Sequence, residues 1–387
     1  MISKSSPSLL EQLEAAGVKV DVDSMDPKIA AGLPFTPHDM TSNQLLVNEQ
    51  LQNPENKELV EKTIREMKGA SWEDVHTVLT ARFAKRVFPH IQGRVLAQTS
   101  PRNAYDKDKI VAHARAYAKA YNAEGISNDR FCIKVPTTTA GAQAAVILLK
   151  DNIRTLGTSL FSLPQAIAAS QAGMLSISPY YNEVRAHVEV DLWPDVEDPA
   201  TQHPMSYRMI HIRDTYRKLA KETGKTQPMI KSASILAHAV VSFITAREAM
   251  GMVELGADHA TILVGCMDDL LSTSRLPTYT KKGEWQTRLR SRLDEPNVKW
   301  ADWAAPAPTV SQERMAAMAK ADPLGKKMNK DFEMASTDID YLADGVLDKA
   351  NEEDEVTRLR LHDALELFKG GEEESRVEIE RLKGVYA

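Results

Sequence analysis

One lysine lies in a run of residues that otherwise has the pattern of a buried strand. The run is CIKVPTTTAG (132–141), and the lysine is Lys134. Charged side chains are rarely fully buried unless they are paired, but a buried amine has a chemical use, which is attack on a ketone to form a Schiff base. Ordinary lysine, with a pKa of about 10.4, is only ~0.04% neutral at pH 7, and a pKa lowered by burial to about 7.5 raises that fraction to roughly a quarter. From the residues alone, the alternative is a lysine that extends to a barrel mouth or pairs with Asp23.

Short apolar runs alternate with longer helical patterns along the 387 residues, which is typical of a parallel α/β fold. We predict eight strands, at 18–23, 35–41, 93–98, 130–135, 154–160, 174–180, 228–234 and 259–264, with helices at 44–66, 72–90, 106–122, 139–151, 162–172, 206–222 and 236–254. Eight such units predict a (β/α)8 TIM barrel with a helical C-terminal extension. Residues 1–270 would form the catalytic barrel domain. Residues 271–387 would form an irregular excursion (271–310) and charged C-terminal helices packed on the same domain.

Alternation of side chains along these strands brings polar residues to one rim of the predicted barrel. In the strand 130–135, three apolar side chains share one face, while Cys132 and Lys134 share the other. Barrel enzymes hold their chemistry at the carboxyl ends of the strands. The inward polar residues near those ends are Asp23, Gln98, Lys134, Thr158 and Tyr180. Several polar side chains in one interior cost free energy unless they are hydrogen-bonded or used.

Composition argues against several classes of protein. The formal net charge of −6, with 26% charged residues, disfavours nucleic acid or a membrane as partner, because both need concentrated positive charge. The two cysteines, Cys132 and Cys266, predict no disulfide framework. The N-terminal residues lack the apolar core of a signal peptide, and no run approaches the ~18 apolar residues of a membrane span. We expect a cytoplasmic protein without a metal site, because no ligand spacing such as His-x-x-x-His occurs.

Several runs of the sequence, in the right order, resemble the motifs of transaldolases. VDVDSMD matches their first-strand aspartate motif and CIKVPTTTAG their Schiff-base lysine motif. HDMTSNQLLV (38–47) is similar to their second-strand motif, whose usual form is Asp-Ala-Thr-Thr-Asn-Pro-Ser-Leu. LFSLPQAIAASQAGMLSISPYY (160–181) resembles their fifth-helix and sixth-strand region, and VEDP (196–199) and YLADGVLDKANEEDEVTRLRLHDALELF (341–368) resemble their C-terminal part. The resemblance spans almost the whole chain and implies that Lys134 forms a Schiff base.

Three substitutions within these motifs point to fructose-6-phosphate aldolases, a smaller branch of the same superfamily. GRVLAQT has Gln98 where transaldolases carry the glutamate that helps to activate the catalytic water. SPYY has Tyr180 in place of phenylalanine, and TLGTS has Leu156 in place of asparagine while it keeps Thr158. A glutamine, a tyrosine and a TLGT run occur in that branch. The chain therefore resembles a transaldolase with an aldolase-like catalytic set.

The resemblance and the chemistry together imply a role for each residue. The iminium on Lys134 serves as the electron sink, so no metal or organic cofactor is expected. Asp23 is the expected base toward the cleaved hydroxyl, Gln98 orients a water, and Tyr180 relays a proton. Thr158 is the expected hydrogen-bond partner of a donor hydroxyl or of water. The expected substrate contacts are Thr41, Asn43, Ser178, Glu183, Ser232 and Ser234. For Thr41 and Asn43, capping of a local turn is the alternative.

The positions that bind phosphate in transaldolases have also changed. The family's arginine after the sixth strand aligns with Glu183, and its seventh-strand arginine or lysine aligns with Ile235. Two lost charge-assisted contacts cost about 3–6 kcal/mol, or roughly 10²–10⁴ in affinity, and Glu183 adds repulsion. Arg185 and Arg208 are the arginines that could rebuild the site.

The leading hypothesis is a Schiff-base aldolase that joins or cleaves a carbon–carbon bond between a small hydroxyketone donor and an aldehyde without phosphate. The alternative is a true transaldolase of the pentose phosphate pathway, which moves a dihydroxyacetone unit between sugar phosphates. A third hypothesis, of another class, is a non-catalytic binding relative. Lys231, in another apolar strand, is the rival nucleophile, and a homodimer is a candidate assembly.

Overall fold

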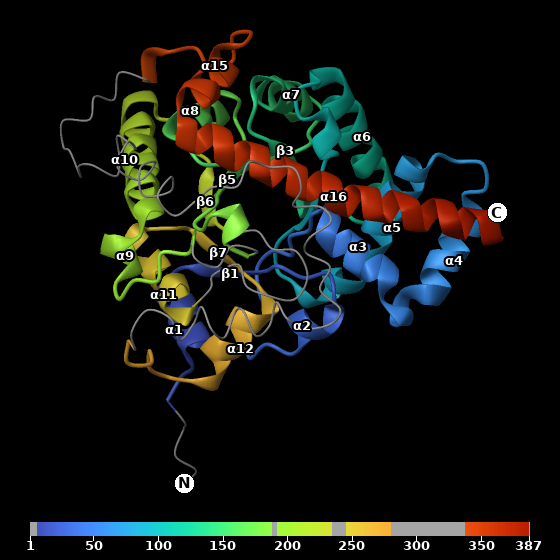
Figure 1. Cartoon of the computed structure of the whole chain (residues 1–387), viewed down its shortest axis with the longest axis horizontal. Coiled ribbons are helices and arrows are strands. Elements are labelled where there is room, and N and C mark those ends of the chain that lie inside the picture. The colour runs from blue at the N-terminus through green and yellow to red at the C-terminus, as the bar shows by residue number, and fades with distance from the viewer. Residues whose placement is uncertain (1–5, 188–191, 234–244, 280–336, 387) are drawn as a thin grey trace.

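Seven parallel strands form one curled sheet in a computed structural model, which describes residues 6–187, 192–233, 245–279 and 337–386. The sheet has the order β1-β7-β6-β5-β4-β3-β2 (Figure 1). The strands are β1 (Lys19–Val22), β2 (Val95–Gln98), β3 (Phe131–Pro136), β4 (Thr155–Leu160), β5 (Ser176–Pro179), β6 (Met229–Ser232) and β7 (His259–Ile262). Each corresponds to a predicted strand.

The eighth position of the barrel is filled by a single residue, Met40. It bridges Val22 of β1 on one side and Val95 of β2 on the other, so it joins the two ends of the sheet. Its backbone N–H donates to Arg94 O at 2.9 Å, and Leu96 N donates to its carbonyl at 2.8 Å. The predicted strand 35–41 is this short because prolines precede Met40, at 34 and 37, and proline cannot donate to a ladder. The predicted (β/α)8 barrel is confirmed.

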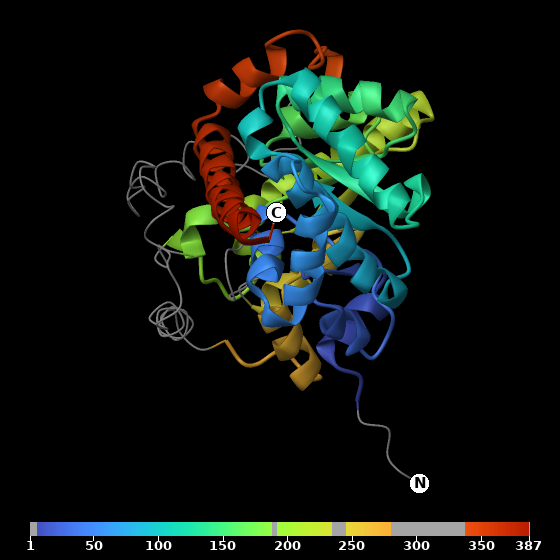
Figure 2. The ribbon, with the colours of Figure 1, turned by 90° about the vertical axis from the view of Figure 1, so that its right-hand side faces the viewer.

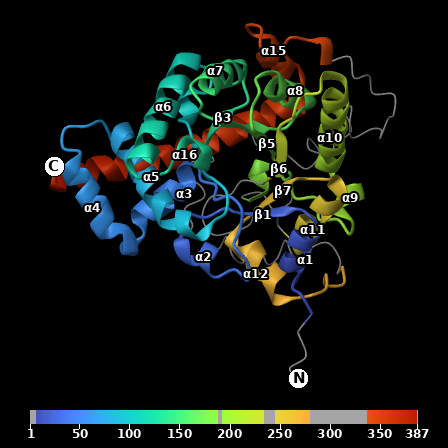
Figure 3. The ribbon, with the colours of Figure 1, turned by 180° about the vertical axis from the view of Figure 1, so that it is seen from behind.

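Helices follow the strands and surround the barrel (Figures 1 and 3). They are α1 (Leu9–Ala15), α2 (Pro27–Ala31), α3 (Gln44–Gln52), α4 (Lys57–Glu66), α5 (Trp72–Val87), α6 (Lys107–Ala123), α7 (Thr139–Lys150), α8 (Leu163–Gln171), α9 (Pro199–Gln202), α10 (Pro204–Thr223), α11 (Ala246–Leu255), α12 (Val264–Ser272), α15 (Val346–Glu353) and α16 (Glu355–Tyr386). The helix predicted at 44–66 is two helices, because Pro54 disfavours a helical residue before it. The predicted excursion includes the end of α12, and residues 280–310 of it lie outside the described part of the chain.

The strands separate an apolar layer from a polar interior, as their alternation predicts. Phe131, Ile133 and Val135 point outward and pack with the surrounding helices in the main hydrophobic core. Cys132 faces the interior, where it packs with Leu96 and Leu156. Among the described helices, none has both the length and the apolar composition that crossing a bilayer requires.

The long helix α16 crosses one end of the barrel. Figure 1 shows it in front of the strands, Figure 3 shows it behind them, and Figure 2 shows it on one side of the barrel. It packs on α3, α4 and α5, and Gly371 permits the close approach, because a Cβ there would lie 2.6 Å from Leu45 Cδ2. Phe368, on the same helix, is fully buried beside Tyr180.

Candidate active site

A small cavity at the carboxyl ends of the strands holds most of the predicted catalytic residues. Its volume is about 20 Å³, which is room for roughly one water molecule. Phe368 of α16 contributes to the wall from outside the barrel. The lining residues are Asp23, Thr41, Asn43, Leu96, Lys134, Leu156, Ser178, Tyr180, Lys231, Ala233, Thr261 and Phe368.

Lys134 lies in β3 with its amine inside the barrel and its side chain 6% exposed. Its Nζ donates to Thr41 Oγ1 and to the Ser42 carbonyl, both at 3.1 Å. Neither acceptor is charged, so the predicted alternative of a lysine paired with Asp23 has no direct hydrogen bond in this structure. Burial lowers the pKa of Lys134 to about 8, although the nearby Asp23 acts in the opposite direction. At pH 7 such a lysine is about one-tenth free amine.

Asp23 follows β1 directly and faces the same cavity. Its Oδ1 is buried and has no hydrogen-bond partner among the described residues. Burial raises the pKa of Asp23 to about 7, the positive charge on Lys134 lowers it, and Glu49 raises it. A carboxyl with that pKa can accept and return a proton near neutral pH.

Gln98 ends β2 at the position that pairs with Lys134 in β3. It is 2% exposed, and neither Nε2 nor Oε1 has a partner among the described residues. Buried polar groups normally have hydrogen bonds. An amide left without them beside the lysine is suited to hold a water or a substrate hydroxyl.

Thr158 and Tyr180 form a hydrogen-bonded pair across β4 and β5. Thr158 Oγ1 and the Tyr180 hydroxyl are 2.6 Å apart, and either can donate. Burial raises the pKa of Tyr180 to about 12, despite the opposing effect of this hydrogen bond. The side chain is therefore a phenol at neutral pH, and it can donate a proton or pass one on but cannot act as a free base.

Three of the predicted substrate contacts, Thr41, Asn43 and Ser178, line the cavity. Asn43 is also the N-cap of α3, where its Oδ1 accepts from Leu45 N at 2.9 Å and Leu46 N at 3.1 Å. The local capping that was the alternative for this residue is therefore present. Thr41 instead accepts from Lys134.

Of the other three predicted contacts, two that the structure describes, Ser232 and Glu183, do not line the cavity. Ser232 faces α10, because Lys231 before it points inward, and its Oγ lies 3.7 Å from Met209 Sδ. Ser234 lies outside the described residues. Glu183 is buried against α16, where Arg360 donates to it from Nε at 2.7 Å and also from Nη2.

The second arginine that could rebuild a phosphate site is engaged elsewhere. Arg208 of α10 is 2% exposed and pairs with Asp354 at 2.8 Å. Its Nη1 also donates to the Phe161 carbonyl at 2.8 Å. The side chain of Arg185 lies outside the described part of the structure.

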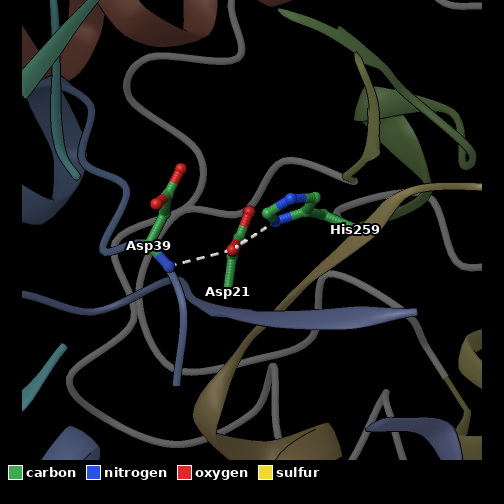
Figure 4. Close-up of side chains that lie close together, drawn as sticks. All are labelled: Asp21, Asp39 and His259. Atoms are coloured by element: carbon green, nitrogen blue, oxygen red, sulfur yellow. Dashed lines mark hydrogen bonds and ion pairs between the residues drawn. The ribbon is translucent and has the colours of Figure 1, made fainter. Parts of the chain in front are cut away.

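A second buried lysine, Lys231 of β6, lines the same cavity but is held by charge. Its Nζ donates to Asp39 Oδ2 at 2.5 Å and to Asp21 Oδ2 at 3.0 Å. His259 lies beside Asp21, with its Nδ1 2.8 Å from Asp21 Oδ1 (Figure 4). Two carboxylates and one imidazole this close could bind a metal ion, but the ammonium of Lys231 already lies between the two carboxylates.

Sequence reasoning missed Phe368, a lining residue that comes from outside the barrel. Phe368 lies more than 200 residues from Lys134 along the chain, and its only signal was the apolar stripe of the C-terminal helix. The partners of Lys231 were also missed. A signal existed, because Asp21, Asp39 and His259 all occupy strand positions with inward parity.

A family model described as "Transaldolase/Fructose-6-phosphate aldolase" matches residues 19–302, which covers most of the barrel. The chain belongs to this family. The resemblance of the sequence motifs to transaldolases is thereby confirmed at the level of the family.

Curated relatives in this family carry the name transaldolase. One from Prochlorococcus marinus (strain NATL1A) is 36% identical over 205 residues, which is 50% of this chain and 61% of the relative. One from Nostoc punctiforme (strain ATCC 29133 / PCC 73102) is 34% identical over 56% of this chain and 67% of the relative. A third, from Prochlorococcus marinus (strain MIT 9211), is 27% identical over 88% of this chain and 94% of the relative. The chain thus spans about three fifths of the first of these relatives and nearly all of the third.

Proposed function

We propose that this member of the transaldolase/fructose-6-phosphate aldolase family is a Schiff-base aldolase with Lys134 as its nucleophile. The observation that carries the proposal is a buried amine whose hydrogen-bond acceptors are both uncharged. Burial without a carboxylate in direct contact favours the neutral form, which is the nucleophile. Its pKa of about 8 keeps a useful fraction of free amine at neutral pH.

The neighbouring side chains supply the proton transfers that the reaction needs. Attack of the Lys134 amine on a ketone gives a carbinolamine, and loss of water gives an iminium. Asp23 then removes the proton of the hydroxyl next to the bond that breaks, and the electrons of that bond flow into the iminium to give an enamine and an aldehyde. Its pKa of about 7 suits a base of this kind. Protonation of the enamine and addition of water, positioned by Gln98 and Tyr180, release the ketone.

The donor is a small hydroxyketone. The cavity has room for about one water molecule as it stands, so even a three-carbon ketone requires side chains such as Phe368 to shift. Thr41 and Ser178 offer hydroxyls to the donor. Leu96 and Leu156 add apolar surface to the cavity wall.

The aldehyde acceptor lacks phosphate. Where the family has an arginine, this chain has Glu183, and Arg360 already neutralises it. Arg208 is likewise paired, with Asp354. A phosphate bound there would have to compete with two carboxylates, of which Glu183 is buried and Asp354 is partly exposed. A buried carboxylate that loses its partner costs several kcal/mol. Glu183→Arg, which restores the family residue, should shift kcat/KM toward phosphorylated aldehydes.

The second candidate function is transfer of a dihydroxyacetone unit between sugar phosphates. The names of the curated relatives favour it. The two functions differ in the fate of the enamine, which is passed to a second aldehyde or hydrolysed. Gln98→Glu would supply a carboxylate at the water position and should change this partitioning toward transfer.

Covalent trapping tests the proposed function. Borohydride reduction in the presence of dihydroxyacetone or hydroxyacetone should add the mass of the reduced donor to the peptide that contains Lys134. Lys134→Ala should abolish the adduct. An adduct on Lys231 in the wild-type protein, or undiminished trapping in the Lys134→Ala variant, would overturn the assignment.

A further inference from the structure

The amine of Lys134 is held by the segment that completes the barrel between β1 and β2. Both acceptors of that amine, Thr41 Oγ1 and the Ser42 carbonyl, directly follow Met40, the single bridging residue between β1 and β2. Backbone hydrogen bonds tie this segment to both neighbouring strands: His38 N donates to Val20 O at 2.8 Å, Thr41 N to Val22 O at 3.0 Å, and Met40 N to Arg94 O at 2.9 Å. Side chains in the barrel interior add a second hold.

Asp39 supplies that hold from the residue before the bridge. Its Oδ1 accepts from Arg94 N at 2.7 Å, ahead of β2, and its own N–H donates to Asp21 Oδ1 of β1 at 3.0 Å. The backbone lies so close to this carboxylate that a Cβ on Gly93 would overlap it and would lie 2.9 Å from the His38 carbonyl. Asp39 thus joins the short strand to both of its neighbours.

Lys231 is the cation on which this arrangement depends. It reaches from β6, on the other side of the barrel, and is 2% exposed. Its ammonium donates to Asp39 Oδ2 and to Asp21 Oδ2. Because Asp21 Oδ1 lies 2.8 Å from His259 Nδ1, the imidazole donates to Asp21 from that nitrogen, and its 3.1 Å approach to Lys231 is then a close contact rather than a hydrogen bond. Without the ammonium, the two buried carboxylates would lose the cation that they share, and among the described residues only His259 and backbone N–H groups would remain to them.

We propose that Lys231 is a positioning residue for Lys134: clamped between Asp21 and Asp39, it fixes the one-residue strand at Met40 and so places the two acceptors of the catalytic amine. This inference rests on the proposed function, because it assigns a role relative to the Schiff-base lysine. The path runs from Lys231 to Asp39 by a hydrogen bond, and from Asp39 along the backbone through Met40 to Thr41 and Ser42. Displacement of a reacting group by about 1 Å can cost roughly 10²-fold in rate.

The test separates the position of the amine from its charge. The variants are Lys231→Met, which leaves two carboxylates without the ammonium, and the double variant Asp21→Asn/Lys231→Met, which removes one charge of each sign and so preserves the net charge. The rate of borohydride trapping with hydroxyacetone is measured from pH 6 to 10, well below each melting temperature. Both variants should trap roughly 10–100-fold more slowly than the wild-type protein at a given pH. The pH midpoint should move to higher pH in Lys231→Met and stay near that of the wild-type protein in the double variant.

The pH readout depends on the charged and titratable groups around each lysine. Asp23 of β1 and Cys132 of β3 act on Lys134, and Glu49 of α3 acts on Asp23. Asp21, Asp39 and His259 surround Lys231. All of them are retained in Lys231→Met, so a shift of its midpoint reports the lost ammonium. Asp23 and Cys132 are also retained in the double variant.

Two further variants identify the path and control for general damage. If Lys231 acts through Thr41, Thr41→Val should slow trapping in the wild-type background and add little in the Lys231→Met background, since the two effects then share one path. Arg82→Met removes a half-buried cation of α5 that pairs with Glu66 and Glu124 outside the barrel, and it should trap at the wild-type rate. Asp39→Asn, which changes one atom of the clamp, replaces Lys231→Met if that variant does not fold.

The possible outcomes distinguish this inference from the proposed function. A double variant, or Asp39→Asn, that traps at the wild-type rate and midpoint overturns the positioning role alone. Slow trapping in Arg82→Met to the same degree would also overturn it, because the loss would then follow stability. Absence of trapping in the wild-type protein would overturn the proposed function and this inference with it.

Discussion

Two lysines lie in one cavity of this barrel, and their surroundings differ in one respect. Lys134 and Lys231 are both at most 6% exposed and both point into the interior. Lys134 donates to a hydroxyl and a carbonyl, whereas Lys231 donates to two carboxylates. Burial lowers the pKa of Lys134 to about 8. Burial acts on Lys231 in the same direction, but Asp21 and Asp39 outweigh it and raise the pKa of its ammonium.

The comparison shows that burial alone does not make a lysine nucleophilic. Desolvation disfavours the ammonium of both side chains, and the partner decides which charge state survives. A carboxylate in contact keeps the proton on Lys231, and uncharged acceptors let Lys134 lose it. Lys134 is thus suited to act as a nucleophile, whereas Lys231 remains an ammonium that neutralises buried carboxylates.

Of the substitutions that distinguish the two lysines, Lys134→Met should have the largest effect on activity. Loss of the amine should reduce aldol cleavage roughly 10⁴-fold or more, because the other amine in the cavity, Lys231, is kept protonated by two carboxylates. The pKa of Lys134 in the folded protein, about 8, is below its ordinary value, so the unfolded chain binds the proton more tightly. This difference lowers the free energy of unfolding of the wild-type protein by about 3 kcal/mol at pH 7. The melting temperature of the variant, measured by calorimetry, should therefore equal or exceed that of the wild-type protein. A folded variant with residual cleavage above a tenth of the wild-type rate would contradict the assignment.

Tyr180→Phe should reduce turnover while it leaves the amine intact. The phenol bonds to Thr158 at 2.6 Å beside the cavity, and a positioned proton donor contributes roughly 10²–10⁴-fold. Borohydride trapping on Lys134 should persist, and steady-state cleavage should fall by that factor. Equal cleavage rates in the variant and the wild-type protein would place the proton relay elsewhere.

The sequence predicted the barrel and the inner set of polar residues, because both follow from alternation along short strands. Parity alone brought Asp23, Gln98, Lys134 and Tyr180 together. Parity was not the basis for Ser232, which faces α10 because Lys231 beside it points inward. Parity could not predict that Glu183 meets Arg360, because that contact joins residues 177 positions apart through the path of α16. Local pattern determines which face a side chain takes, but only the packed chain determines its partner.

Lys231→Met should lower stability where Lys134→Met does not. Removing the cation leaves Asp21 and Asp39 buried without their partner, and breaking a buried pair in this way costs about 3–5 kcal/mol. Urea unfolding at pH 7 should show a lower midpoint with an unchanged slope. Asp21→Asn in the same chain should recover part of the loss, because only one buried carboxylate then remains. A stability equal to that of the wild-type protein would show that His259 or bound water compensates for the ammonium.

The pH dependence of imine formation gives the smallest effect and the sharpest distinction between the lysines. With a pKa of about 8, the free-amine fraction of Lys134 rises about tenfold between pH 7 and pH 9 and then levels off. The trapping rate should follow that curve. If Lys231 were the nucleophile, the rate would still be climbing above pH 10, because its carboxylate partners raise the pKa of its ammonium. Cleavage should rise more steeply than trapping below pH 8, since it also requires ionised Asp23, whose pKa is about 7. If the pH profiles of trapping and cleavage coincide from pH 6 to 8, Asp23 is not the base, although Lys134 is still the nucleophile.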